Sequence, residues 1–295
     1  MRILNPDSLF RQAQMSLEKL DRDQIKGLLG LKRWKEAEMG LPLSEYLRLS
    51  ILLRASGIGC MKAFWQINRQ AYQRAGGSFP SYPVFHKWMM RLEGVLRHLL
   101  DLTLGRLGQR LGLIDSMRLP IGSESRFIKS MGREAGIGHS SCGRYFGRKL
   151  HALIDEGGHL LAFDLTPASV HDLAPIKKGM LAGHKGLIYG DRGYLSQAVR
   201  FELMKEGIDF VARPKEGMGH ATDWSFDYVR MFESKHKKRY RKRMGIERYF
   251  ARLKRGWGLS ILGLRSRRMA DSVTLAALLA SQWLALGLIE TEKIV

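Results

Sequence analysis

The sequence is poor in cysteine, and this scarcity excludes two classes of protein. Its 295 residues include only two cysteines, Cys60 and Cys142, which are too few for a disulfide framework. Neither cysteine lies at the spacing of paired metal ligands, so a zinc cluster built on thiolates is excluded as well. A chain that needs no disulfide bonds fits a reducing cytoplasm.

Segments for export or for membrane insertion are also scarce. The first residues, Met1–Asp7, lack the charged and then apolar layout of a signal peptide, so we expect no export. The one long apolar run, Val273–Ile289, is interrupted by Thr274, Ser281 and Gln282 and is barely long enough to cross a bilayer. We therefore predict a buried helix here, and an anchored, membrane-associated protein is the alternative.

Acidic residues are few in comparison with basic ones. The chain has 28 Asp and Glu against 49 Lys and Arg, which gives a formal net charge of +21 and a pI near 10.2. Such an excess favours a polyanionic partner, because Lys and Arg that neutralise phosphates release condensed counterions. A basic protein without a polyanionic partner is the alternative. The 45% hydrophobic content is enough for a large core in one or two domains.

No internal repeat or low-complexity tract is present, and residues 1–105 are predicted to be helical. Apolar residues recur at helical spacing in Leu43–Leu53 and Phe64–Tyr72, with glycine-rich breaks between the segments. A short basic amphipathic helix is expected over Val84–Leu92. This order is typical of DNA-docking helical domains and equally of plain helical bundles. We interpret residues 1–105 as a helical region that binds DNA ends.

From Leu111 onward, strands alternate with helices, which is the pattern of an α/β fold. The predicted strands, of which the second and third form a hairpin, are Leu111–Asp115, Tyr145–Ile154, His159–Leu165, Gly186–Asp191 and Ile208–Ala212. The predicted helices are Asp172–Leu181, Ser196–Glu206 and the strongly basic Lys235–Trp257. The segment Pro120–Gly143 is interpreted as a long loop, and Gly217–Phe232 shows no clear period.

Three carboxylates stand out in this pattern. Asp115 and Asp191 each end an apolar strand, and carboxyl ends of neighbouring parallel strands share one edge of a sheet. Glu247 is the single acid among eleven Lys and Arg between Lys235 and Arg255. Each acid alone has a simpler explanation, because Asp favours turns after strands and Glu247 can pair with Arg243 at i−4. Together, they suggest a metal site.

The motifs around these acids resemble a known family. Tyr240, Arg243, Glu247 and Lys254 fit the pattern Tyr-x-x-Arg-x-x-x-Glu-x-x-x-x-x-x-Lys, which resembles the glutamate signature of bacterial insertion-sequence transposases of the Asp-Asp-Glu (DDE) class. The sequence Tyr-Gly-Asp-Arg-Gly-Tyr around Asp191 resembles the second-aspartate motif of this family, and Ile-Asp-Ser at 114–116 resembles its first. The segments 145–151 and 165–172 are similar to further family segments. The resemblance covers roughly residues 111–264.

The resemblance implies a fold and an activity. It implies a ribonuclease-H-like α/β sheet flanked by helices in residues 106–295, which end in a C-terminal apolar helix. It further implies a transposase that cleaves DNA at element ends and transfers the strand into target DNA. Asp115, Asp191 and Glu247 would be the catalytic residues and would hold two divalent cations, Mg²⁺ or Mn²⁺.

The resemblance also implies partners. DNA, both the terminal repeats and the target, would be the substrate, and the residues expected to contact it are Tyr240, Arg243, Lys254, Arg192 and Lys149. A homodimer on DNA is expected because two ends must be brought together. The location would be the bacterial cytoplasm, in association with the nucleoid.

Other interpretations remain open at this stage. A metal-dependent, structure-selective nuclease on the same fold would hydrolyse DNA and stop there. A catalytically idle DNA-binding regulator would have lost a carboxylate, and all three are present. We interpret Asp172 as a helix cap, Tyr194 as no covalent nucleophile, and Trp88 and Trp257 as packing residues rather than base-stacking ones.

Overall fold

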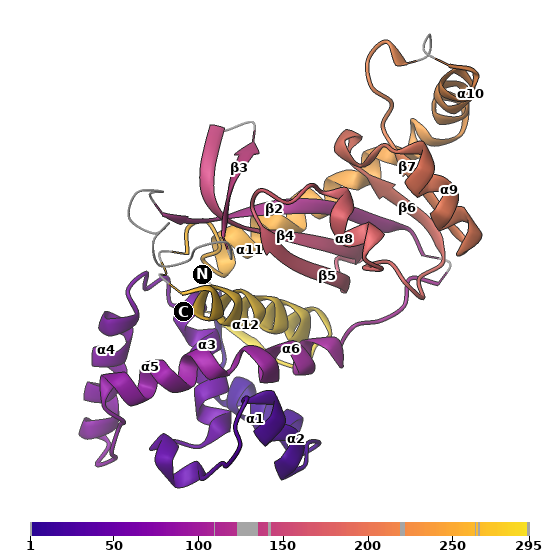
Figure 1. The fold of residues 1–295 in the computed structure, drawn as a ribbon. Coiled ribbons are helices and arrows are strands. Elements are labelled where there is room, and N and C mark those ends of the chain that lie inside the picture. Colours follow the sequence, from indigo (N-terminus) through magenta and orange to yellow (C-terminus); the bar gives the residue numbers. More distant parts are fainter. Residues whose placement is uncertain are drawn as a thin grey trace. The chain divides into compact units, whose positions relative to one another are not determined.

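The computed structural model describes residues 2–108, 110–122, 135–140, 143–218, 222–262, 264 and 266–293 (Figure 1). The chain divides into two compact units. The first combines Met1–Thr103, Leu119–Ala135 and Arg252–Val295, and the second combines Leu104–Arg118 with Gly136–Ala251. Cys142 and much of the predicted loop 120–143 lie outside the described residues.

The first unit is helical, as the periodicity of residues 1–105 predicts. Its α-helices are α1 (Pro6–Leu17), α2 (Arg22–Leu28), α3 (Leu43–Ala55), α4 (Met61–Arg74), α5 (Tyr82–Arg91), α6 (Glu93–Asp101) and α12 (Arg267–Ala285). Capping side chains mark the first residues of two of these helices. The Asn5 side chain accepts from the backbone N–H of Ser8 to cap α1, and Asp21 and Gln24 form a reciprocal capping box on α2.

Helix α12 packs with the N-terminal helices. It contacts α3, α5 and α6 (Figure 1), and side chains around its whole circumference are buried, from Met269 to Trp283. A helix that is apolar all round needs partners on every side, and α3, α5 and α6 provide them. The predicted buried helix is thus confirmed from Val273 to Trp283, whereas the helix ends at Ala285 and Leu284, Leu286 and Leu288 are exposed. The division of the chain differs from the predicted limit at residue 105, because α12 belongs to the first unit.

No helix in the described residues is long and apolar enough to cross a membrane. The two ends of the chain meet in a small antiparallel sheet of β1 (Arg2–Leu4) and β8 (Thr291–Lys293), which the sequence pattern does not predict. Strands of three residues carry too little alternation to be recognised.

A six-stranded sheet forms the α/β part of the chain. Its strands are β2 (Gly112–Gly122), β3 (Gly136–Ser140), β4 (Gly143–Asp155), β5 (Leu160–Pro167), β6 (Gly186–Gly190) and β7 (Ile208–Ala212). Their order is β3-β4-β2-β6-β7, and β5 pairs with β4 as well. The predicted hairpin of β4 and β5 is confirmed, and β2, β6 and β7 run parallel. This mixed sheet with flanking helices is the predicted ribonuclease-H-like architecture.

Two helices cover part of this sheet and close its core. Helix α8 (Leu173–Lys177) is shorter than predicted. Helix α9 (Gln197–Lys205) is capped by Ser196, whose hydroxyl accepts from the N–H of Val199. Apolar side chains from both helices and the strands share one cluster, which includes Ile114, Ile188 and Phe210. These buried strands therefore hold the edge of the sheet where the candidate site lies.

Three segments differ from the predictions. Strand β2 runs on to Gly122 instead of ending at Asp115, with Met117, Leu119 and Ile121 buried at alternate positions. Strand β3 lies in the predicted loop, and helix α10 (Asp223–Met231) lies in the segment without a clear period. The predicted basic helix is divided into a π-helix at Phe232–His236, a 3-10 helix at Arg239–Arg243 and α11 (Met244–Gly256).

A close approach of two helices gives a prediction on stability. A Cβ atom added to Gly94 of α6 would lie 2.2 Å from the backbone oxygen of Leu28 at the end of α2. We expect Gly94→Ala to force these helices apart and to lower the free energy of unfolding by about 1–3 kcal/mol. Thermal or urea unfolding measures this loss.

The matched control is Gly27→Ala on α2, because an added Cβ there meets no atom within 4 Å. Alanine at this helical position should leave the stability unchanged or raise it by up to about 1 kcal/mol. Equal stability of the Gly94→Ala variant and the wild-type protein would show that α2 and α6 do not approach as described.

Candidate active site

The first two carboxylates lie on neighbouring parallel strands. Asp115 lies within β2, and Asp191 follows β6 directly. The register pairs Gly112 with Ile188 and Leu113 with Tyr189. Continued along both strands, this register brings Asp115 level with Asp191. The two aspartates therefore lie at one edge of the sheet, as predicted, although β2 continues beyond its aspartate.

Glu247 reaches the same place from the first turn of α11. The guanidinium of Arg243 donates from Nη1 to Asp115 Oδ2 at 2.9 Å and from Nη2 to Glu247 Oε1 at 2.7 Å. The predicted ion pair of Arg243 and Glu247 is thus present, and it also includes Asp115. A Cβ on Gly245 would lie 2.7 Å from the side chain of Leu113, so glycine allows the start of α11 to approach β2.

The surroundings of Asp115 disfavour the charged form of its carboxyl group. Its pKa is raised to about 6, mainly by burial and in smaller part by the charge of Asp191, while the N–H of Ser116 and the guanidinium of Arg243 act in the opposite direction. The backbone N–H of Ser116 donates to Asp115 Oδ1 at 2.8 Å. A single guanidinium does not offset this burial and the neighbouring charge. The site therefore favours additional positive charge.

The donor set fits hard divalent cations. Asp115 and Glu247 both face one cationic group, the guanidinium of Arg243, and carboxylate oxygens are the ligands that Mg²⁺ prefers. The described residues contain no group of three or more His, Cys, Asp or Glu side chains already gathered for a metal ion. Asp115 and Glu247 are thus placed to hold a cation. Asp191 offers the same carboxylate oxygens and lies beside Asp115.

Three aromatic residues support the end of β6. The hydroxyl of Tyr240 donates to the backbone oxygen of Gly190 at 2.8 Å, next to Asp191. The hydroxyl of Tyr189 forms a 3.1 Å hydrogen bond with Nδ1 of His236, and its ring contacts Tyr240 edge to face. Burial raises the pKa of Tyr240 to about 12. Tyr240, predicted to contact DNA, therefore uses its hydroxyl to hold the strand that carries Asp191.

A basic pocket lies at the carboxyl ends of β6 and β7. Its volume is about 480 Å³, and its lining includes Arg192, Arg213 and Lys215 together with Glu216 and Glu233. Arg192 was predicted to contact DNA, while Arg213 and Lys215 were missed. Their signal was available, because both follow the predicted strand that ends at 212, where α/β sheets bind ligands.

Lys149 and Asp172 form a separate polar group. Lys149 donates to Asp172 Oδ1 and to the backbone oxygen of Val170, both at 2.9 Å, so its ammonium is held within the unit. The interpretation of Asp172 as a helix cap is wrong, because its side chain makes no capping bond to α8. His151 lies 3.9 Å from the same carboxylate, and burial lowers its pKa to about 4.

Several other predictions are confirmed by burial. The side chain of Tyr194 is 1% exposed, and burial raises its pKa well above the usual value, which disfavours the phenolate that a covalent nucleophile needs. Trp88 and Trp257 are buried, as expected for packing residues. Lys254 is half-buried on the later part of α11, which belongs to the first compact unit.

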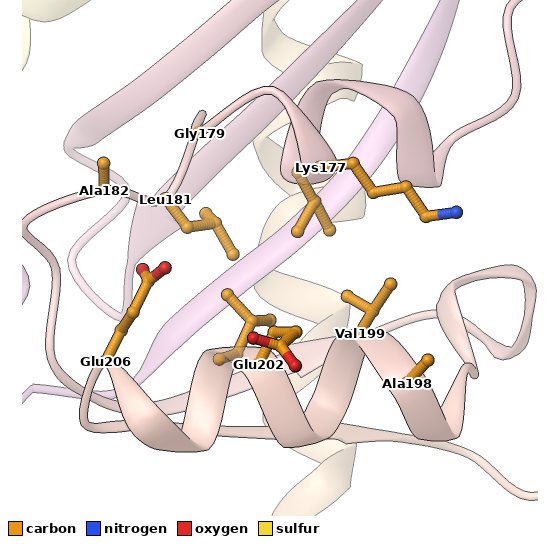
Figure 2. Close-up of a pocket in the computed structure, with 10 residues that line it drawn as sticks. Lys177, Gly179, Leu181, Ala182, Ala198, Val199, Glu202 and Glu206 are labelled. Carbon is orange, nitrogen blue, oxygen red and sulfur yellow. The ribbon is translucent and has the colours of Figure 1, made fainter.

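An apolar groove of about 350 Å³ lies between the α8 segment and α9. Figure 2 shows Leu181 and Val199 pointing into it, and both belong to the core cluster of this unit. Glu202 and Glu206 lie along its α9 side, and Glu202 pairs with Lys205 at 2.8 Å. None of the three predicted catalytic carboxylates lines this groove, so we assign it no part in the chemistry.

Comparison with known proteins identifies the family. A family profile described as the transposase DDE domain matches residues 106–283, which is more than half of the chain and includes Asp115, Asp191 and Glu247. Searches against curated proteins and against solved structures gave no match. The chain therefore belongs to the family of transposases with a DDE domain.

Proposed function

We propose that this protein is an insertion-sequence transposase that cleaves DNA at the ends of its element and transfers the freed strand into target DNA. The observation that carries the proposal is the convergence of Asp115 and Glu247 on one cationic group, with Asp191 on the adjacent strand. An acidic site beside basic residues suits phosphodiester chemistry, which needs cations close to the scissile phosphate.

In this proposal, Asp115, Asp191 and Glu247 hold two divalent cations, Mg²⁺ or Mn²⁺. When bound, such cations activate a water or a 3′-hydroxyl as nucleophile and stabilise the leaving oxygen. The backbone N–H of Ser116 orients Asp115 for this task, and Glu247 is the more exposed ligand, because its side chain is 53% exposed. Tyr240 keeps the end of β6, and with it Asp191, in place.

The basic residues of the site bind the substrate. Arg192, Arg213 and Lys215 line a pocket at the sheet edge and are suited to backbone phosphates near the cleavage point. Arg243, which pairs with two carboxylates, would turn to the scissile-strand phosphate once cations neutralise Asp115 and Glu247. Both strand cleavage and strand transfer then take place at one site.

We further propose that the protein acts as a homodimer on DNA in the bacterial cytoplasm, since transposition joins two ends of one element. The helices of residues 1–103 would recognise the terminal repeats, because they lie outside the matched DDE domain and carry no member of the catalytic set. Measuring the mass of the complex with end DNA tests the dimer.

The decisive experiment is a strand-transfer assay. Duplexes that carry the DNA flanking this reading frame, with a recessed 3′-hydroxyl, are incubated with the protein, Mg²⁺ and a supercoiled plasmid. We expect covalently joined products, and their loss in the Asp191→Asn variant. Asp209→Asn is the matched control, because Asp209 is an exposed acid on the adjacent strand β7 that pairs with Arg200 at 3.2 Å.

The possible results separate the three functions. Joined products that depend on Asp191 support a transposase. Hydrolysis without joining would contradict the proposal in favour of a nuclease. Binding of end DNA with neither reaction would leave a DNA-binding regulator.

A further inference from the structure

A second charged cavity lies in the first compact unit, among α2, the junction of α5 and α6, and the start of α12. Its volume is about 350 Å³, and four arginines line it: Arg91, Arg97, Arg267 and Arg268. Glu93 is the single acid in the lining. The close contact of Gly94 with the end of α2 forms part of the wall, so most of the cavity wall is built from packed helices.

The acids near this cavity neutralise only part of its charge. Arg267 donates to Glu93 at 2.9 Å and to Asp271 of the next helical turn at 3.0 Å. Arg91 donates to the backbone oxygen of Leu29 at 3.3 Å, and this neutral acceptor does not neutralise the charge of the arginine. Arg268 is exposed, and no carboxylate in the described part of the chain forms an ion pair with it. The lining thus keeps a net positive charge.

The start of α12 adds to this potential. Helix N-termini are stabilised by a capping side chain and by acids in the first turn, because the free N–H groups and the helix dipole are positive there. In α12, Ser266 makes no side-chain capping bond, and the first turn contains Arg267 and Arg268 but no acid. This arrangement costs stability in the isolated protein, and an anion bound at the N-terminus would offset that cost.

We propose that this arginine pocket, formed by Arg91, Arg97, Arg267 and Arg268, binds a backbone phosphate of duplex DNA. One planar guanidinium group can donate two parallel hydrogen bonds to two oxygens of a phosphate, and the uncapped backbone N–H groups at the start of α12 are further donors. DNA is the favoured source of the phosphate because the chain carries a net charge of +21 and belongs to a transposase family. The proposal rests on the proposed function for the identity of the partner, which is DNA. It does not depend on the catalytic roles of the three carboxylates.

The test is a titration of a fluorescent 30-base-pair duplex, taken from the DNA flanking the reading frame, with wild-type and Arg268→Ala protein at 50–200 mM salt. Loss of one phosphate contact should weaken binding about tenfold and reduce the slope of log affinity against log salt by about 1. The double variant Arg97→Ala with Arg268→Ala should lose more. Thermal unfolding of each variant verifies that the helices remain packed.

Arg11→Ala is the matched control, because Arg11 is an exposed arginine of α1 in the same unit and lies outside the pocket. It should change affinity and salt slope far less than Arg268→Ala. Equal effects of the two variants would overturn the proposal, because they would reflect net charge alone.

Two further measurements distinguish the other outcomes that would contradict the pocket or the proposed function. Thermal stabilisation by millimolar inorganic phosphate that disappears in Arg268→Ala, with unchanged DNA binding, would assign the pocket to a free phosphate and overturn the DNA assignment. A wild-type protein that binds no duplex at all would contradict the proposed function itself. Normal DNA binding by the folded Arg268→Ala variant would contradict only the pocket.

Discussion

Replacing Glu247 by glutamine is expected to slow metal-dependent DNA cleavage by at least two to three orders of magnitude. The substitution keeps the shape of the side chain and its hydrogen bond to Arg243 but removes an anionic oxygen ligand from a hard cation. Stabilisation of the transition state by a metal ion contributes several kcal/mol, and each 1.36 kcal/mol corresponds to about one decade in rate. Binding of DNA should persist or strengthen, since a negative charge is removed.

The alternative role of Glu247, an ion pair with Arg243, predicts a different result. An exposed pair at i−4 contributes a few tenths of a kcal/mol to stability, and its loss would leave cleavage near normal. The matched control is Glu156→Gln, because Glu156 also forms an exposed pair, with Lys242 at 2.6 Å, in the same unit. Cleavage and affinity are measured side by side. A fully active Glu247→Gln enzyme would remove this residue from the site.

Local patterns in the sequence were sufficient to predict the central strands and the motif residues. The strand that leads to Asp191 is a short apolar run, and the two strands of the β4–β5 hairpin are connected by a turn that contains glycines. Both signals lie within a few neighbouring residues. Strand β2 was predicted too short because Pro120 and the polar residues around it suggested a loop, although alternate residues beyond Asp115 are buried.

Contacts between distant residues could not be predicted in this way. No local rule indicates that Arg243 reaches Asp115, because 127 residues separate them in the chain and only the fold brings them together. The basic helix is interrupted where His236 is buried against Tyr189, which charge counting does not reveal. The partners of α12 were missed for the same reason, since its apolar residues show that it is buried but not against which helices.

The helix α10 illustrates a signal that was present but not recognised. Thr222 and Ser225 form a reciprocal capping box at its start, with the N–H of Ser225 donating to the Thr222 hydroxyl at 3.1 Å. The usual box has Glu or Gln in the second position, so a serine there did not mark a helix. The hydroxyl of Tyr228 then joins α10 to the end of β7 through a 2.9 Å bond from the N–H of Ala212.

The affinity of the protein for duplex DNA should fall steeply as salt rises. A net charge of +21 is concentrated in part on the segment 235–255, where Lys235, Lys238, Arg239, Arg241 and Arg248 are exposed. Each phosphate that such a residue neutralises releases condensed counterions, and this release is less favourable at higher salt. For six or more phosphate contacts, we expect a loss of roughly 10³-fold or more between 50 and 200 mM salt.

Titration of a labelled duplex at four or more salt concentrations measures this loss as the slope of log affinity against log salt. A slope near −5 or steeper corresponds to about six contacts, at about 0.9 per phosphate. Because the exposed cations of the segment 235–255 are independent of the catalytic acids, Glu247→Gln should keep the wild-type slope while losing cleavage. A flat salt profile would contradict binding through backbone phosphates, and the charge of the segment would then need another polyanion as its partner.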